Sequence, residues 1–230
     1  MMTLPKLLRK ANLSLPVTVH HWLIASACFS GLLLLTRIIA TGSLVYLFLP
    51  WNLLLAFIPY VLTRWMTSNI SIVENKVKLV IAVAIWLLFI PNSFYIITDF
   101  YHLSHFRSAP QWFDLLLIFS FAWNGILCGI ISLSRVESVI SVIRGKGLSL
   151  LLVFLVMWLS AFGVYIGRFL RYNSWDVLTD TVSLAGEIGD MLLHPLVNAY
   201  AWGMTICYAI FMTLLYEAIK KMANLFSEKN

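Results

Sequence analysis

The stretch that decides the fold is Leu148–Phe169, LSLLLVFLVMWLSAFGVYIGRF, in which twenty residues pass before the first charged side chain, Arg168. A helix of about 20 apolar residues crosses the roughly 30 Å hydrocarbon core of a bilayer. The run is continuously apolar and does not alternate, which favours a helix over a transmembrane β-strand. The sequence therefore predicts a membrane-spanning helix at this position.

Five further segments have the same length and character. They are Trp22–Ile39, Leu47–Met66, Val77–Ile97, Trp112–Leu133 and Leu196–Tyr216. Proline inside a helix removes a backbone donor, so Pro91 predicts a kink or a break in the third span. We therefore expect an all-α, polytopic integral membrane protein built as a bundle of six transmembrane helices.

The composition excludes the common alternatives to a membrane protein. Of 230 residues, 61% are hydrophobic and 11% are charged, and the mean hydropathy is +0.89. Soluble domains are about 25% charged, so this chain cannot cover a water-facing globular surface, and it is too apolar to be disordered. The net charge of +6 does not indicate nucleic-acid binding, because the basic residues lie in small groups between the apolar runs.

The lysines and arginines predict the orientation of the chain. Twelve of the sixteen lie on one side of the predicted spans; the other four are Arg37, Arg107, Arg168 and Arg171. Because basic loops stay in the cytoplasm, we expect an inner-membrane protein with both termini cytoplasmic. The predicted parts are a cytoplasmic segment over residues 1–20, one six-helix domain over 21–219 and a cytoplasmic tail over 220–230. The first span is expected to be retained and not cleaved as a signal.

Polar residues gather near the outer end of the third span. On an α-helix Asn92, Tyr95, Asp99 and His102 fall within an arc of roughly 80°. An ionisable group at this depth is costly unless it faces water or the interior of the bundle. We therefore predict a polar site with Asp99 and His102 as acid–base groups and Asn92 and Tyr95 as substrate-binding residues. The alternative is that Asp99 is simply hydrated just beyond the membrane boundary.

Two arginines, Arg168 and Arg171, end the fifth span on the side that basic residues normally avoid. This position favours a fixed anionic partner, either a carboxylate such as Asp99 or Asp176 or the phosphate of a lipid. We place Arg168, Arg171 and Asp176 among the substrate-binding residues. The alternative is that both arginines only anchor the helix to headgroups.

The outer loop after the fifth span has a helical pattern of apolar residues. From Trp175 to Met191 they recur at helical spacing with acidic residues between them. This pattern predicts one or two amphipathic helices on the outer interface, serving either as a lid or as a simple connector. His194 and Pro195 are then expected to begin the sixth helix, because proline suits a first turn.

No metal site or cofactor is assigned from the sequence. His105, Asp114 and His194 are only weak metal candidates, because their spacing matches no recognised motif. Asp114 also has a structural explanation, since a carboxylate stabilises the positive N-terminal end of the fourth helix.

Within the spans, small and amide residues predict helix–helix contacts. Gly125, Gly129 and Ser132 form a small-residue face that allows close packing. The isolated amides Asn52, Asn124 and Asn198 are each expected to bond to a neighbouring helix.

Three segments carry a resemblance to a known family. They are LFIPNSFYIITDFYHL (88–103), WFDLLLIFSFAWNGILCG (112–129) and GRFLRYNSWDVL (167–178). Together they resemble the bacterial membrane proteins grouped as domain of unknown function 1361, over the chain from about Leu47 to the end of the sixth span. The resemblance implies a multi-helix inner-membrane protein and supplies no active site.

The functional hypothesis rests on the outer polar groups. It is an enzyme or binding site that faces the outer leaflet and acts on a lipid or lipid-linked anionic substrate. The alternatives are an accessory subunit without chemistry and a small proton-coupled transporter. The expected partners are the lipid bilayer and an anionic lipid or lipid-linked substrate, with no nucleic acid.

Overall fold

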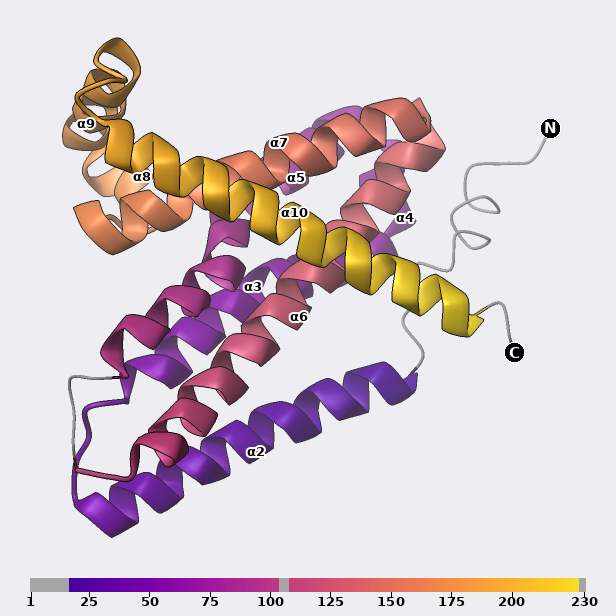
Figure 1. Ribbon diagram of the computed structural model, residues 1–230. Helices are drawn as coiled ribbons and strands as arrows, with labels where there is room; N and C mark the ends of the chain where they lie inside the picture. Colours follow the sequence, from indigo (N-terminus) through magenta and orange to yellow (C-terminus); the bar gives the residue numbers. More distant parts are fainter. Residues whose placement is uncertain (1–16, 104–107, 228–230) are drawn as a thin grey trace. The chain divides into compact units, whose positions relative to one another are not determined.

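The computed structural model describes residues 17–103 and 108–227, which fall into two compact units, Met1–Ser149 and Leu150–Asn230 (Figure 1). Unit 1 contains α2 (Val17–Thr41), α3 (Phe48–Ser68), α4 (Ile70–Glu74), α5 (Lys76–Tyr95), the 3₁₀ helix η1 (Ile96–His102) and α6 (Gln111–Arg144). Most of α7 (Lys146–Tyr165) lies in unit 2, with the π-helix η2 (Ile166–Leu170), α8 (Asp176–Thr179), α9 (Thr181–Leu193) and α10 (Ala199–Ser227). Every regular element among the described residues is helical, which confirms the predicted all-α class.

Five helical segments are long and apolar enough to cross a membrane. They are Val19–Thr41, Lys76–His102, Gln111–Arg144, Lys146–Leu170 and Ala199–Ala223. These five confirm the predicted first, third, fourth, fifth and sixth spans as helices of membrane-crossing length. The protein is therefore an integral membrane protein with several membrane-spanning helices.

The predicted second span forms a helix as well, but a less apolar one. α3 has 21 residues, and it is not among the five candidate spans. Two prolines, Asn52 and Arg64 lower its hydropathy. A sixth crossing therefore stays a prediction, as do the single domain over residues 21–219 and the orientation of the termini.

Several helix boundaries differ from those expected. α5 continues through Pro91 and changes to a 3₁₀ helix only at Ile96, so the helix does not break at Pro91, and the alternative outcome, a kink there, stays a prediction. α6 has 34 residues, or about 50 Å, and extends well past Leu133. α10 begins at Ala199 and not at Pro195, which lies in a turn. Apolar periodicity locates the middle of a helix better than its ends, because caps and tertiary contacts determine the ends.

In unit 1, α3 packs against α5 and α6, and α2 packs along α6 (Figure 1). A Cβ on Gly125 would lie 2.7 Å from Cγ2 of Ile96. A Cβ on Gly129 would lie 2.8 Å from Cβ of Ser93. The predicted small-residue face is therefore confirmed as the surface on which α6 approaches the end of α5. This close approach fixes the position of η1.

Polar side chains inside unit 1 join the helices. Asn124 donates from Nδ2 to Oγ of Ser30 on α2 at 3.2 Å, as expected for an amide inside a span. Ser132 on α6 accepts from Nε1 of Trp86 on α5 at 2.6 Å and donates to the carbonyl of Pro59 on α3 at 2.9 Å. One hydroxyl thus links three helices.

Replacing Ser132 by alanine is expected to lower the free energy of unfolding by about 1–2 kcal/mol, because the buried Trp86 N–H then loses its acceptor. Thermal unfolding in detergent micelles would measure the loss. Ser138→Ala is the matched control, since among the described residues the Ser138 hydroxyl bonds only to the carbonyl of Ser134 on its own helix. Equal effects of the two substitutions would contradict the linking role of Ser132.

In unit 2, aromatic rings pack between α7 and α10. The Trp202 ring centroid lies 5.4 Å from that of Phe162 and 6.4 Å from that of Trp158. Its Nε1 donates to the carbonyl of Met191 on α9 at 3.1 Å. The predicted helices of the outer loop are confirmed as α8 and α9, whereas their role as a lid stays a prediction.

Candidate functional site

Asp99 lies in η1 and is buried, with 1% of its surface exposed. Nδ2 of Asn52 on α3 lies 3.1 Å from Oδ1 and 2.9 Å from Oδ2 of this carboxylate. The amide therefore holds the carboxyl group in one orientation and meets part of its hydrogen-bonding demand. The Asp99 side chain is enclosed by protein, so it is not simply hydrated.

The change from α5 to η1 places His102 close to the same edge as Asp99. A 3₁₀ helix has three residues per turn, so residues three apart are eclipsed. The His102 ring is half-buried, and its centroid lies 4.8 Å from that of Phe48. The structure thus places both predicted acid–base residues on one edge of a short helix.

The two predicted substrate-binding residues of α5 are half-buried. Nδ2 of Asn92 donates to the carbonyl of Phe89 at 3.0 Å, and the carbonyl of Tyr95 accepts from Thr98 at 2.7 Å. Both residues lie in the last turn of α5, directly before η1. Asn92 and Tyr95 therefore stay predictions as ligand-binding residues.

A buried ion pair lies at the same end of unit 1. Nε of Arg37 on α2 donates to Oδ1 of Asp114 at 2.7 Å, and Nη2 donates to Oδ2 at 3.1 Å. Nη2 also donates to Oγ of Ser108 at 3.1 Å. Asp114 does lie in the first turn of α6, as predicted, but its side chain serves as the counter-ion of Arg37.

Tyr46 connects this ion pair to η1. Its hydroxyl lies 3.4 Å from Oδ2 of Asp114 and 3.4 Å from the carbonyl oxygen of His102, and Cζ of Arg37 lies 4.4 Å from the centre of its ring. Burial first, and then the negative charge of Asp114, raise the pKa of Tyr46 to about 12. The phenol therefore stays a neutral donor throughout the physiological range.

A pocket of about 260 Å³ opens beside the ion pair, between the end of α2 and the start of α6. Its lining includes Arg37, Thr41, Ser108 and Phe113. Nη1 of Arg37 is buried and has no hydrogen-bond partner among the described residues. We name this cavity the Arg37 pocket; its lining combines apolar residues (Ala40, Ala109, Pro110 and Phe113) with the side chain of Arg37.

The residues predicted from the fifth span and the outer loop lie in unit 2. Arg168 is half-buried in η2, and Arg171 is exposed with a left-handed backbone (φ 62°) at the end of that helix. Asp176 accepts hydrogen bonds from Asn173 and Thr179, and the backbone bond from Asn173 is the main reason that its pKa is lowered. Asp176 therefore lies in the first turn of α8 and bonds to its own segment, and the described residues show no ion pair between it and either arginine.

The weak metal candidates are not brought together in the part of the chain that the structure describes. No group of three or more His, Cys, Asp or Glu side chains there could hold a metal ion. Asp114 is bonded to Arg37, and Nδ1 of His194 lies 2.9 Å from Oδ1 of Asp190. His105 lies outside the described residues.

Sequence reasoning missed Arg37 and Tyr46 as members of this end of unit 1. Arg37 is one of the four basic residues on the predicted outer side, so the argument made for Arg168 and Arg171 applied to it equally. Tyr46 gave no such signal, because it is one of nine tyrosines and its role follows only from its position between α2 and α6.

One protein-family model, described as "Protein of unknown function (DUF1361)", matches residues 51–215. No curated protein and no solved structure matches the chain. The family match runs from Trp51 in the first turn of α3 to Leu215 in the middle of α10, and it leaves α2, with Arg37, outside the matched region.

Proposed function

The chain belongs to the DUF1361 family, and on that premise we propose that it is a six-span inner-membrane protein with both termini in the cytoplasm. Its outer end would bind a lipid or lipid-linked substrate that carries an anionic group. The charge distribution supports this orientation, since twelve of its sixteen basic residues precede or follow the spans on one side.

The observation that carries the proposal is the Arg37 pocket. A buried guanidinium normally uses all its donors, because each unsatisfied donor costs free energy. Nη1 of Arg37 is unused, and Ser108 accepts a bond from Nη2, so its own hydroxyl hydrogen can turn to a ligand. Two donors beside an apolar wall fit a phosphate or carboxylate attached to a hydrocarbon chain.

Asp99 and His102 are the proposed acid–base groups of this end. The Asn52 amide fixes the orientation of the Asp99 carboxylate. A carboxylate held in this way can transfer a proton to or from a neighbouring group, which is the role we propose for Asp99. Arg168, Arg171 and Asp176 stay in the proposal as substrate-binding residues of unit 2, together with Asn92 and Tyr95 of unit 1.

The accessory-subunit alternative is favoured by one observation, namely that Asp114 already neutralises the charge of Arg37. A neutral ion pair requires no anionic ligand. An enzyme would lose turnover when Asp99 is replaced, whereas an accessory subunit would not. A measurement of lipid binding in the Arg37 pocket, followed by a measurement of turnover, therefore separates the two functions.

The binding test uses the exposed Ala40, which lines the Arg37 pocket. Ala40→Trp is expected to fill the pocket and abolish binding of phosphatidylglycerol there, as measured by native mass spectrometry of the protein in detergent. Ala25→Trp is the matched control, since Ala25 is exposed on the same helix outside the pocket. Unchanged binding by Ala40→Trp would overturn the proposed site.

The turnover test uses Asp99→Asn, which keeps the size of the side chain. If the site is an enzyme, lipid composition should differ between cells that make the wild-type protein and cells that make the variant, with a turnover about 10²- to 10⁴-fold lower. Lipid bound in the Arg37 pocket should remain. Identical lipid profiles with intact binding would favour the accessory subunit.

A further inference from the structure

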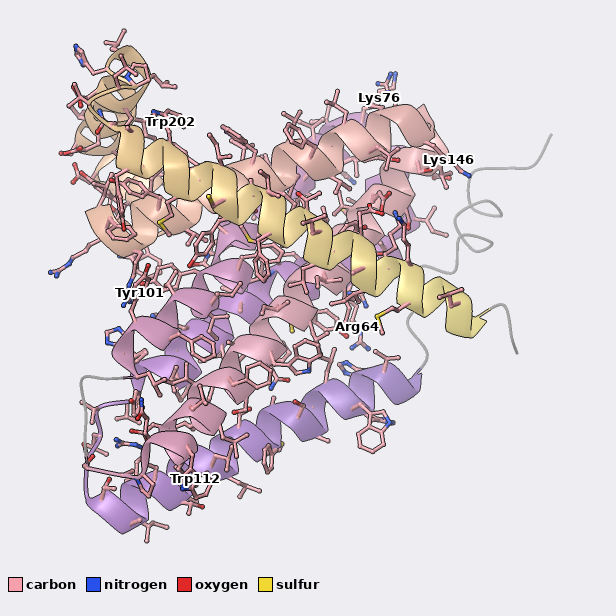
Figure 2. The ribbon with its side chains drawn as sticks, in the orientation of Figure 1. Arg64, Lys76, Tyr101, Trp112, Lys146 and Trp202 are labelled. Atoms are coloured by element: carbon pink, nitrogen blue, oxygen red, sulfur yellow. The ribbon has the colours of Figure 1, made fainter. Side chains whose placement is uncertain are left out.

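A second group of polar side chains lies at the opposite end of unit 1. It consists of His20 on α2, Tyr60 and Arg64 on α3, and Arg135 on α6, and we name it the cationic cluster. Figure 2 shows Arg64 at the end of unit 1 away from Tyr101 and Trp112. None of these four residues belongs to the outer site proposed above.

Arg135 is buried without a counter-ion. Only 6% of its surface is exposed, its Nη1 donates to the carbonyl of Tyr60 at 3.2 Å, and its Cζ lies 4.6 Å from the centre of the Tyr60 ring. Its Nε has no hydrogen-bond partner among the described residues. Among the described residues no carboxylate lies within ion-pair distance of Arg135 or Arg64. A buried guanidinium that is paired only with a carbonyl and a ring is costly, and an anion would remove that cost.

The hydrogen bonds within the cationic cluster leave N–H and O–H donors available for a ligand that accepts hydrogen bonds. Arg64 can only donate, so its Nη1, which lies 3.0 Å from Nε2 of His20, makes that nitrogen the acceptor. Nδ1 of His20 then carries the hydrogen and donates to Oη of Tyr60 at 2.9 Å. The Tyr60 hydroxyl hydrogen and the remaining guanidinium N–H groups are left to bind an acceptor.

The cluster lies at the depth of a lipid headgroup. Arg135 follows Asp114 by 21 residues on α6, which places the two polar ends roughly 30 Å apart, about the thickness of a hydrocarbon core. Trp22 and Trp65, next to His20 and Arg64 in the chain, are 76% and 55% exposed. Exposed tryptophans are typical of the membrane–water interface.

We infer that the cationic cluster binds the phosphate group of an anionic membrane lipid. Arg64 is exposed and would make the first contact, Tyr60 would donate its hydroxyl hydrogen, and Arg135 would supply the charge and the unused Nε donor. A phosphate offers several acceptor oxygens to such a set of donors. A soluble phosphate compound carries the same group, so the test must compare the two sources.

The test measures binding of phosphatidylglycerol to the purified full-length protein in detergent, by native mass spectrometry and thermal shift. Arg64→Gln is expected to weaken binding about fivefold, the effect of one basic residue near anionic lipid. Arg144→Gln is the matched control: Arg144 is exposed in the last turn of α6 and outside the cluster. Its effect should be below about twofold.

Three outcomes would overturn the inference. They are equal binding of phosphatidylglycerol and phosphatidylcholine, equal losses in Arg64→Gln and Arg144→Gln, and displacement of the lipid by inorganic phosphate at comparable concentration, which would make the ligand a soluble phosphate. Arg135→Lys is used in place of Arg135→Gln because it keeps the buried charge; retained folding with weakened lipid binding would support the inference. In the Ala40→Trp background, where the outer site is blocked, Arg64→Gln should still weaken the remaining phosphatidylglycerol binding about fivefold, so failure here is distinguishable from failure of the outer site.

Discussion

Replacing Asp114 by leucine is expected to lower the free energy of unfolding by about 3–5 kcal/mol, because the Arg37 guanidinium then stays buried without its counter-ion. Both side chains are almost fully buried, and the pair is held by two hydrogen bonds of 2.7 and 3.1 Å. Tyr46 loses an acceptor in the same step. The measurement is the thermal unfolding midpoint in detergent micelles, with denaturant unfolding as a second measure.

The double variant Arg37→Met with Asp114→Leu is the decisive control. Removing both charges eliminates the unpaired guanidinium, so most of the lost stability is expected to return, as is usual when a buried ion pair is replaced by apolar residues. A double variant as unstable as Asp114→Leu alone would show that the loss comes from altered packing and not from the uncompensated charge.

Replacing Gly129 by alanine is expected to destabilise the protein by about 1–3 kcal/mol, the usual cost of an extra methyl group in a packed core. The new Cβ would lie 2.8 Å from Cβ of Ser93 and 3.0 Å from the ring of Phe94. Both neighbours belong to α5, so relief of the overlap must shift that helix away from α6. Since η1 continues from α5, Asp99 and His102 would move with it.

Gly31→Ala is the matched control for this substitution. Gly31 lies on α2, and a Cβ there would meet nothing within 4 Å. Alanine should therefore stabilise this helix by about 0.5–1 kcal/mol relative to glycine. The same chemical change is thus expected to shift the unfolding midpoint in opposite directions at the two positions, and a shift of the same sign would contradict the close packing at Gly129.

The sequence predicted correctly those features that depend on the residues of a single segment. The apolar runs predicted helices that the structure contains, and Gly125 and Gly129 predicted the face on which α6 packs. Of the two outcomes predicted at Pro91, a break does not occur, because a membrane helix can continue through proline when neighbours satisfy the freed backbone groups; a kink stays a prediction.

The sequence by itself determined that this chain resides in a bilayer, because hydrophobicity and length are additive properties of each segment and need no partner. Only the tertiary structure determined which charged side chain pairs with which. Arg37 and Asp114 are 77 positions apart, and no spacing rule connects them until α2 and α6 pack together. Arg135 shows the converse: a basic residue typical of a helix end in the sequence became, once buried, a charge that needs an anion.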